Sequence, residues 1–209
     1  VSALTAGAVR IAASEEEEAG FSAVSAAYSM SIETEMKSGV YYTPYYPLTL
    51  PEGAAPYHDA YIRNSSQRTS YAVLYTDAHT DVPDETYEAF VHETYTQVPD
   101  QTRQALADIL QQLDVQPGDD PHRILAAVQS YVSSSARYDL NTPAVPDGED
   151  FVSWFLHESE TGYCVHFATA AAILLRCMDV PARYVTGFST NVTAGSWTTV
   201  TTDDANAWV

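Results

Sequence analysis

Basic residues are scarce in this sequence. Lys and Arg together number 9 against 28 Asp and Glu, which gives a formal net charge of -19 at pH 7. A surface with this charge repels the backbone of nucleic acids and the headgroups of an anionic membrane. We therefore expect no nucleic-acid partner, whereas a neutral or cationic partner would meet no long-range electrostatic barrier.

Long apolar runs are also lacking. The sequence contains no stretch of about 18 apolar residues, the length that a membrane-spanning helix needs. Its first residues do not show the basic and then apolar pattern of a secretory signal peptide. We therefore expect any membrane attachment to depend on segments outside this chain.

Cysteine is limited to Cys164 and Cys177. These residues form neither a C-x-x-C pair nor a Cys/His cluster with the spacing of zinc ligands, so no disulfide framework, metal site or cofactor is expected. No internal repeat occurs, which excludes solenoids and propellers. With 45% hydrophobic residues and 11% aromatic residues, the chain can still form one sizeable core or two small ones.

The first half of the chain mixes several kinds of local pattern. Four glutamates at residues 15–18 follow Ser14 and predict the acidic first turn of a helix that continues over residues 19–36. Residues 39–56 are dense in Tyr and Pro, which favours extended edge or loop structure; a carbohydrate or peptide platform is the alternative. Residues 71–76 form a short apolar run that is typical of a strand.

The second half is predicted to be mainly helical. Helix starts are expected near residues 83, 99, 120 and 150. Asp120, which stands before a proline, and Asp150 supply the capping side chains that begin such helices. We therefore expect a compact domain over residues 99–209, with residues 1–98 forming an N-terminal accessory region of mixed structure.

Cys164 is predicted to stand at the start of a buried, Ala-rich helix that runs from about residue 163 to residue 177. A thiol in that position feels the positive end of the peptide dipoles, which favours the thiolate. The alternative is that Cys164 is a buried small apolar residue, as most free cysteines are. Cys177 would lie about 20 Å away along the same helix, too far for a disulfide, and is interpreted as structural.

Residues 162–168 read G-Y-C-V-H-F-A, residues 174–176 read L-L-R, and residues 181–188 read P-A-R-Y-V-T-G-F. These segments resemble the core motif of the bacterial transglutaminase-like family, which is G-x-C-x-x-F/Y-A, followed by L-L-R and then by P-A-R-x-V-x-G-F/Y. The resemblance is sharp over residues 151–209, and the G-Y-C-x-H-F-A variant is most similar to extracytoplasmic domains of membrane-anchored members. The matching residues are Gly162, Cys164, Phe167, Ala168, Leu174, Leu175, Arg176, Pro181, Ala182, Arg183, Val185, Gly187 and Phe188.

The resemblance implies an α+β, papain-like transglutaminase core. In such a core the helix that begins with the cysteine packs on an antiparallel sheet, which here would contain residues 181–188 and 196–209. The family catalyses acyl transfer through a thioester, from a glutamine side chain or a peptide bond to an amine or to water. The implied substrate is a protein or peptide, and the implied location is outside the cytoplasm, at the cell surface or anchored to a membrane.

Residue 206 departs from the family pattern. The second signature of the family is A-H-A-W-V-E, and Asn206 stands where the histidine base is expected. An amide cannot take up a proton at neutral pH, so Asn206 could orient a group but could not activate Cys164. The strand that should supply the family's aspartate does not follow. A natural pseudoenzyme, an engineered change and a truncated record of a longer protein all explain this departure.

We therefore expect the chain as given to be catalytically inactive. The alternative function is a non-catalytic binding or structural ectodomain. His166 is the nearest imidazole, but two positions along a helix from Cys164 it points to a different face, and it is considered only as a substitute base. Asp203 and Asp204 are interpreted as turn residues and not as the missing acid.

Overall fold

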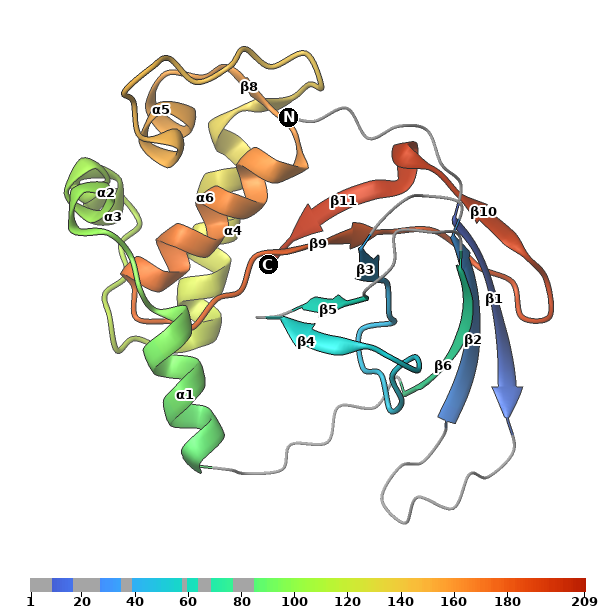
Figure 1. The fold of residues 1–209 in the computed structure, drawn as a ribbon. Helices are drawn as coiled ribbons and strands as arrows, with labels where there is room; N and C mark the ends of the chain where they lie inside the picture. Colours follow the sequence, from blue (N-terminus) through green and yellow to red (C-terminus); the bar gives the residue numbers. More distant parts are fainter. Residues whose placement is uncertain (1–8, 17–26, 35–38, 58–59, 64–68, 77–84) are drawn as a thin grey trace. The chain divides into compact units, whose positions relative to one another are not determined.

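The computed structural model describes residues 9–16, 27–34, 39–57, 60–63, 69–76 and 85–209. The fold is α+β, as predicted, and divides into two compact units (Figure 1). The β unit comprises residues 1–82 and 187–205, and the helical unit comprises residues 83–186 and 206–209. These units are defined by spatial contacts, and the division of the sequence at residue 98 stays a prediction.

The β unit is built on a four-stranded sheet in the order β10-β1-β2-β6. Neighbouring strands in this sheet are antiparallel. Its small core contains the buried side chains of Ile32, Val73 and Val200. The strands are β1 (Val9–Glu16), β2 (Ala27–Thr34), β6 (Thr69–Tyr75) and β10 (Thr198–Val200).

The helix predicted over residues 19–36 is wrong where the structure describes it. Residues 27–34 form strand β2, and the part of the acidic run up to Glu16 belongs to β1; residues 17–26 lie outside the described residues. In β2, Tyr28, Met30 and Ile32 alternate with Ser29 and Ser31, the period-two pattern of a strand with one buried face. The acidic run was therefore misinterpreted as a helix start.

A second sheet of the β unit lies in the Tyr-rich region. Its order is β3-β5-β4, with β3 at Val40–Tyr41, β5 at Ala60–Ile62 and β4 at Ala55–Tyr57. The extended structure predicted for residues 39–56 is confirmed. Tyr71 of β6 ties this region to the larger sheet, because its hydroxyl accepts from the Tyr42 N–H and donates to the Tyr42 carbonyl, both at 2.9 Å.

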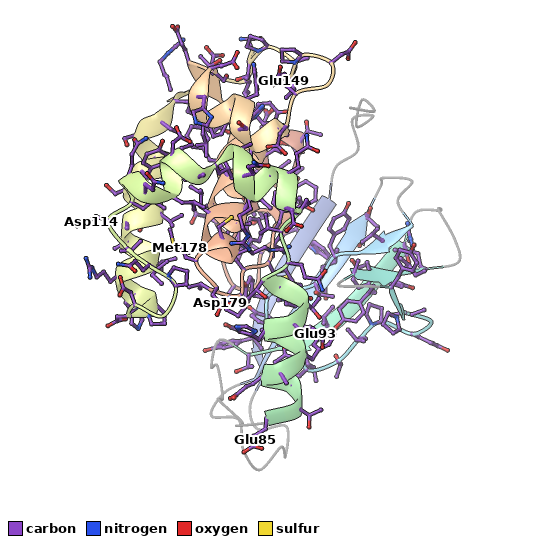
Figure 2. All side chains as sticks on the ribbon, turned by 90° about the vertical axis from the view of Figure 1, so that its left-hand side faces the viewer. Glu85, Glu93, Asp114, Glu149, Met178 and Asp179 are labelled. Carbon is purple, nitrogen blue, oxygen red and sulfur yellow. The ribbon has the colours of Figure 1, made fainter. Side chains whose placement is uncertain are left out.

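Six helices lie in the described part of the helical unit: α1 (Glu85–Tyr95), α2 (Asp100–Ala105), α3 (Ala107–Gln112), α4 (Pro121–Ser135), α5 (Phe151–His157) and α6 (Cys164–Cys177). Asp120 and Asp150 cap α4 and α5 as predicted. The helix expected from residue 99 is interrupted at Leu106 and becomes α2 and α3. Glu85 and Glu93 project from α1, none of whose side chains is buried (Figure 2).

One hydrophobic cluster joins α3, α4, α5 and α6. Ile109, Val128, Phe155 and Leu174 are almost completely buried in it, and Trp154 belongs to it as predicted. Just before α6, β8 (Thr161–Gly162) pairs in parallel with β7 (Arg137–Tyr138). None of the helices within the described residues has the length and apolar character needed to cross a bilayer.

The sheet predicted to contain residues 181–188 and 196–209 is divided in the structure. β9 (Val185–Phe188) pairs with β11 (Ala205–Trp208), whereas β10 pairs with β1 in the larger sheet. A 3-10 turn, η1 (Thr202–Asp204), separates β10 from β11, so Asp203 and Asp204 are turn residues as predicted.

Candidate active site

Cys164 is the first residue of α6, which confirms the predicted helix start. The preceding residue, Tyr163, has extended backbone angles of φ -125° and ψ 179° and is the N-cap. Cys164 is half-buried, whereas Cys177 ends the same helix and is buried. Burial raises the pKa of the Cys177 thiol. The two free thiols thus lie at opposite ends of one helix, and only Cys164 is accessible enough to meet a substrate.

Close packing holds the turn that leads into Cys164. A Cβ atom on Gly162 would lie 2.5 Å from Cε2 of Phe155 and 3.1 Å from Cβ of His166. Both distances are shorter than ordinary contacts between carbon atoms, so glycine is required for steric reasons at this position. The first residue of the family motif therefore has a physical role, because it lets α5 and the first turn of α6 approach each other.

His166 packs on the side of α6 that faces α5. Its side chain is 4% exposed, and its ring stacks on Phe151 with a centroid distance of 5.0 Å. Its Nδ1 accepts a hydrogen bond from the Tyr163 N–H at 3.4 Å. His166 and Cys164 both lie within the described residues, and no hydrogen bond joins them. Burial lowers the pKa of His166. This geometry does not favour His166 as a substitute base.

An apolar groove of about 470 Å³ contains Cys164. None of its lining side chains is charged, so the groove suits a neutral group next to the thiol. It lies among α4, α6 and the end of β11. Its lining residues are Leu125, Val128, Gln129, Val132, Ser133, Tyr138, Cys164, Phe167, Ala168, Ala171, Leu175, Ala207, Trp208 and Val209.

Asn206 lies in β11 and is exposed. Its Oδ1 accepts a hydrogen bond from the Ala207 N–H at 2.9 Å, so its amide oxygen is engaged by its own strand. The next three residues line the groove with Cys164, whereas Asn206 does not. The structure therefore brings the strand of Asn206 to the groove of Cys164, and the role of Asn206 as the base position stays a prediction.

Tyr184 is a neighbour of this site that the sequence did not single out. Burial raises its pKa, and its electrostatic interactions with Cys164 and Tyr163 raise it further. Its phenol therefore stays protonated near the thiol. It occupies the variable position of P-A-R-x-V, and only the adjacent motif residues could have drawn attention to it.

The two arginines of the family motifs support the fold. Arg176 donates from Nε to the Ala182 carbonyl at 2.8 Å, and its guanidinium lies 6.0 Å from the ring centroid of Tyr95. The guanidinium of Arg183 lies 5.8 Å from the same ring. These contacts tie the end of α6 to α1 and to the segment that leads into β9, so we assign both residues a structural role.

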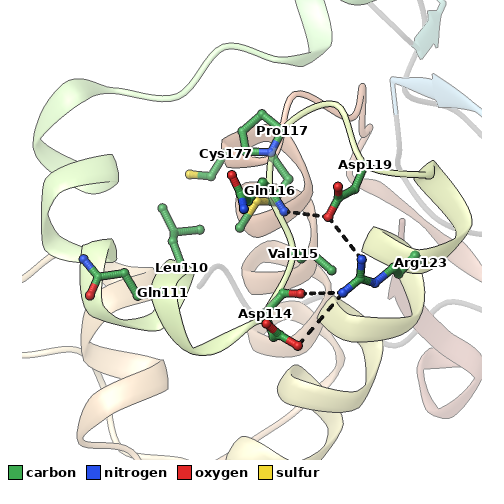
Figure 3. Close-up of a pocket in the computed structure, with 10 residues that line it drawn as sticks. Leu110, Gln111, Asp114, Val115, Gln116, Pro117, Asp119, Arg123 and Cys177 are labelled. Carbon is green, nitrogen blue, oxygen red and sulfur yellow. Dashed lines mark hydrogen bonds and ion pairs between the residues drawn. The ribbon is translucent and has the colours of Figure 1, made fainter.

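A second cavity, of about 540 Å³, lies at the other end of α6 (Figure 3). Arg123 is one of its lining residues; it lies 3.6 Å from the Asp119 carboxylate and donates to the Asp114 carbonyl at 2.9 Å. The buried Cys177 also lines it. Within the described residues no group of three or more His, Cys, Asp or Glu side chains is arranged to hold a metal ion.

Part of this chain is similar to known proteins. Residues 108–209 match the family model described as "Transglutaminase-like superfamily". The chain is 37% identical over 108 residues to "Protein-glutamine gamma-glutamyltransferase" of Pseudomonas aeruginosa, an alignment that covers 51% of this chain and 15% of that protein. It is 34% identical over 102 residues to "Uncharacterized protein YebA" of Bacillus subtilis, covering 45% of this chain and 14% of that protein.

A solved structure shares the fold. The periplasmic domain of TgpA from Pseudomonas aeruginosa, in a crystal structure bound to ethylmercury, superposes with a TM-score of 0.65 at 22% sequence identity, covering 97% of this chain and 83% of that one. Residues 108–209 therefore form a transglutaminase-like domain, and the resemblance drawn from the motifs around Cys164 is confirmed. The matched region is only about one-seventh of the curated relatives' length.

Proposed function

We propose that Cys164 is the nucleophile position of a cysteine acyl-transfer site, which acts on a glutamine side chain or a peptide bond in a protein or peptide. The observation that carries this proposal is the half-buried thiol at the first position of α6, open to an uncharged groove. The name of the Pseudomonas relative, a glutamine gamma-glutamyltransferase, supports the same chemistry.

The reaction would proceed through a thioester. The Cys164 thiolate attacks the carboxamide carbon, the C–N bond breaks, and the leaving nitrogen takes up a proton and departs as ammonia or as an amine. A second amine or a water molecule then attacks the thioester carbon, loses a proton and releases the thiolate. Both steps need a group that exchanges protons near the sulfur.

The chain as given should lack turnover, because Asn206 has no proton to exchange. An amide can donate and accept hydrogen bonds, but it is not a base at neutral pH. Since general acid–base catalysis typically contributes about 10²- to 10⁴-fold, its loss leaves a reactive thiol without an efficient reaction cycle. A non-catalytic binding or structural ectodomain is the second candidate, and the engaged amide of Asn206 favours it.

The location proposed for this domain is outside the cytoplasm, at the cell surface or anchored to a membrane. The solved structure that shares its fold is described as a periplasmic domain, which supports this location.

The test compares the unchanged chain with Asn206→His, Asn206→Gln and Cys164→Ala. A glutamine-containing peptide with a fluorescent amine reports transamidation, and released ammonia reports hydrolysis. We expect only a background rate in the unchanged chain and in Asn206→Gln. Asn206→His should exceed this background by about 10²- to 10⁴-fold, and adding Cys164→Ala to that variant should abolish the gain.

Two outcomes would count against the proposal. Cys164-dependent turnover in the unchanged chain would show that position 206 is not the base position. No gain in Asn206→His, with Cys164 still readily alkylated by iodoacetamide, would favour the binding function.

A further inference from the structure

His166 contacts both backbone groups of the residue before Cys164. Its Nδ1 accepts from the Tyr163 N–H at 3.4 Å, and its own backbone N–H donates to the Tyr163 carbonyl at 2.8 Å. Two bonds to one residue fix the direction in which the chain enters α6. Because Cys164 is the next residue, the same bonds fix the direction of its Cα–Cβ bond.

The ring of His166 is itself held in place. It lies 5.0 Å from the ring of Phe151, 5.3 Å from that of Phe155 and 4.5 Å from that of Tyr163, measured between centroids. Gly162 leaves no room for a side chain beside it. A ring confined on these sides, with 4% of its surface exposed, cannot swing away from the Tyr163 amide without disturbing the core.

We propose that His166 is a positioning residue for Cys164: it accepts the Tyr163 amide hydrogen and thereby holds the first turn of α6 in the geometry that presents the thiol to the groove. Histidine combines an aromatic ring with an acceptor nitrogen, and this site uses both. The ring is neutral with its hydrogen on Nε2, since an Nδ1 that accepts a hydrogen bond carries no hydrogen. The lowered pKa that burial gives His166 agrees with that form.

The experiment separates the acceptor from the ring. His166→Asn keeps an acceptor oxygen at a similar distance from the backbone, and His166→Phe keeps an aromatic ring but has no acceptor. His157→Phe is the matched control, because His157 lies on α5 and bonds to Ser153 and Asp108 instead of α6. Iodoacetamide alkylation of Cys164 is followed by mass spectrometry of the digested peptides, which counts Cys177 separately.

We expect His166→Phe to slow the alkylation of Cys164 by about threefold to tenfold, the population change that one hydrogen bond of ordinary net strength can make. His166→Asn should stay within about twofold of the unchanged chain, and His157→Phe should match it. Equal rates in the Asn and Phe variants would overturn the proposal, because the ring alone, or neither feature, would then decide the geometry.

A measurement on the unchanged chain covers the case in which a variant fails to fold. The ¹⁵N chemical shifts of the His166 ring should show a protonated Nε2 and an unprotonated Nδ1. A hydrogen on Nδ1 would overturn the proposal, because that nitrogen could not accept from Tyr163.

The inference rests on the proposed function only in taking Cys164 as the reacting thiol. A His166 effect on alkylation without any turnover in Asn206→His would contradict the acyl-transfer function alone. Turnover in Asn206→His without a His166 effect would contradict the positioning role alone.

Discussion

The helical unit is stabilised internally by one kind of interaction, and the β unit by another. In the helical unit, α3 to α6 share one large cluster of buried side chains, and α4 and α5 begin at aspartate caps that accept from N–H groups two or three residues further on. In the described part of the β unit, the buried cluster consists of Ile32, Val73 and Val200, and antiparallel pairing joins the strands, including β1 and β10 from opposite ends of the sequence. The helical unit should therefore be the more sensitive to loss of a buried side chain.

The largest loss of stability is expected when a buried side chain is truncated and leaves a cavity in the core of either unit. Leu174→Ala in α6 and Ile32→Ala in β2 both truncate aliphatic side chains that are no more than 2% exposed. Changes of this kind cost about 2–5 kcal/mol, and more where the surroundings cannot close around the cavity. We expect Leu174→Ala near the upper end and Ile32→Ala near the lower end, as measured by urea unfolding.

Hydrogen exchange assigns each loss to its unit, because the amides of the affected unit should lose protection first. An equal or larger cost for Ile32→Ala would show that the β unit is as tightly packed as the helical unit.

The next largest loss of stability is expected when Gly162, which has no room for a side chain, is replaced by alanine. Gly162→Ala would force the new Cβ atom to within 2.5 Å of the Phe155 ring, and overpacking of this kind costs about 1–3 kcal/mol. Gly39→Ala in the β unit is the control, because the nearest atom to its Cβ would be 4.0 Å away. We expect only the first change to lower the melting temperature and alter the alkylation rate of Cys164. Unchanged stability in Gly162→Ala would mean that α5 and α6 can separate freely at this point.

The sequence predicts the helical unit better than the β unit. Asp120, Asp150 and the start of α6 at Cys164 were predicted, because a helix start depends on residues within one turn. The strand at residues 27–34 was missed, because four glutamates imitate a helix start while the strand depends on partners such as residues 69–75. The separation of β10 from β11 was missed for the same reason.

Around Cys164, too, the sequence predicts the local structure but not the contacts between distant segments. The sequence predicted that a helix begins at Cys164 and that His166 points to a different face of it, and the structure agrees on both points. The role of Cys164 as nucleophile stays a prediction. It did not predict that His166 would bond to Tyr163 or that Tyr184 would lie near the thiol. Such contacts depend on how α5 and the segment after α6 pack, which no short motif records.

A matched pair of polar changes compares the two units directly. Asp150→Ala removes an acceptor that serves the N–H groups of Val152 and Ser153, and should cost about 1–2 kcal/mol. Tyr71→Phe removes the hydroxyl that serves both backbone groups of Tyr42, and should cost about 1–2 kcal/mol. Chemical denaturation measures both, with Asp150→Asn as the variant that keeps a cap. A cost near zero for Tyr71→Phe would show that water replaces the hydroxyl.

Tyr71 also gives the β unit a dependence on alkaline pH. Burial raises its pKa from 10.0 to about 12. A group with a raised pKa contributes stability that is fully present below the unfolded value near 10 and is lost as the pH rises toward 12. We expect the melting temperature of the unchanged chain to fall over this range more steeply than that of Tyr71→Phe. If the melting temperatures of the two chains fall in parallel as the pH rises, the Tyr71 hydroxyl is in contact with water.

The smallest change in stability is expected when an exposed ion pair of the helical unit is removed. Nε2 of His157 in α5 lies 3.1 Å from Oδ2 of Asp108 in α3. The hydrogen bond from His157 lowers the pKa of Asp108, so its contribution to stability is present above the unfolded value near 4 and is lost as the pH falls through the lower folded value. Asp108→Asn should therefore lower the melting temperature slightly at pH 5 and leave it unchanged near pH 2.

Removing any one negative charge from a chain of net charge -19 also relieves repulsion, which would raise the melting temperature and hide the loss of the pair. Glu149→Gln isolates the pair, because it removes the same charge from an exposed position on the loop before α5. The pair's contribution is the difference between the two variants, and 1 M NaCl should shrink it because salt screens exposed charges. If Asp108→Asn and Glu149→Gln shift the melting temperature equally at every pH, the pair contributes nothing and the two helices are joined by their apolar contacts alone.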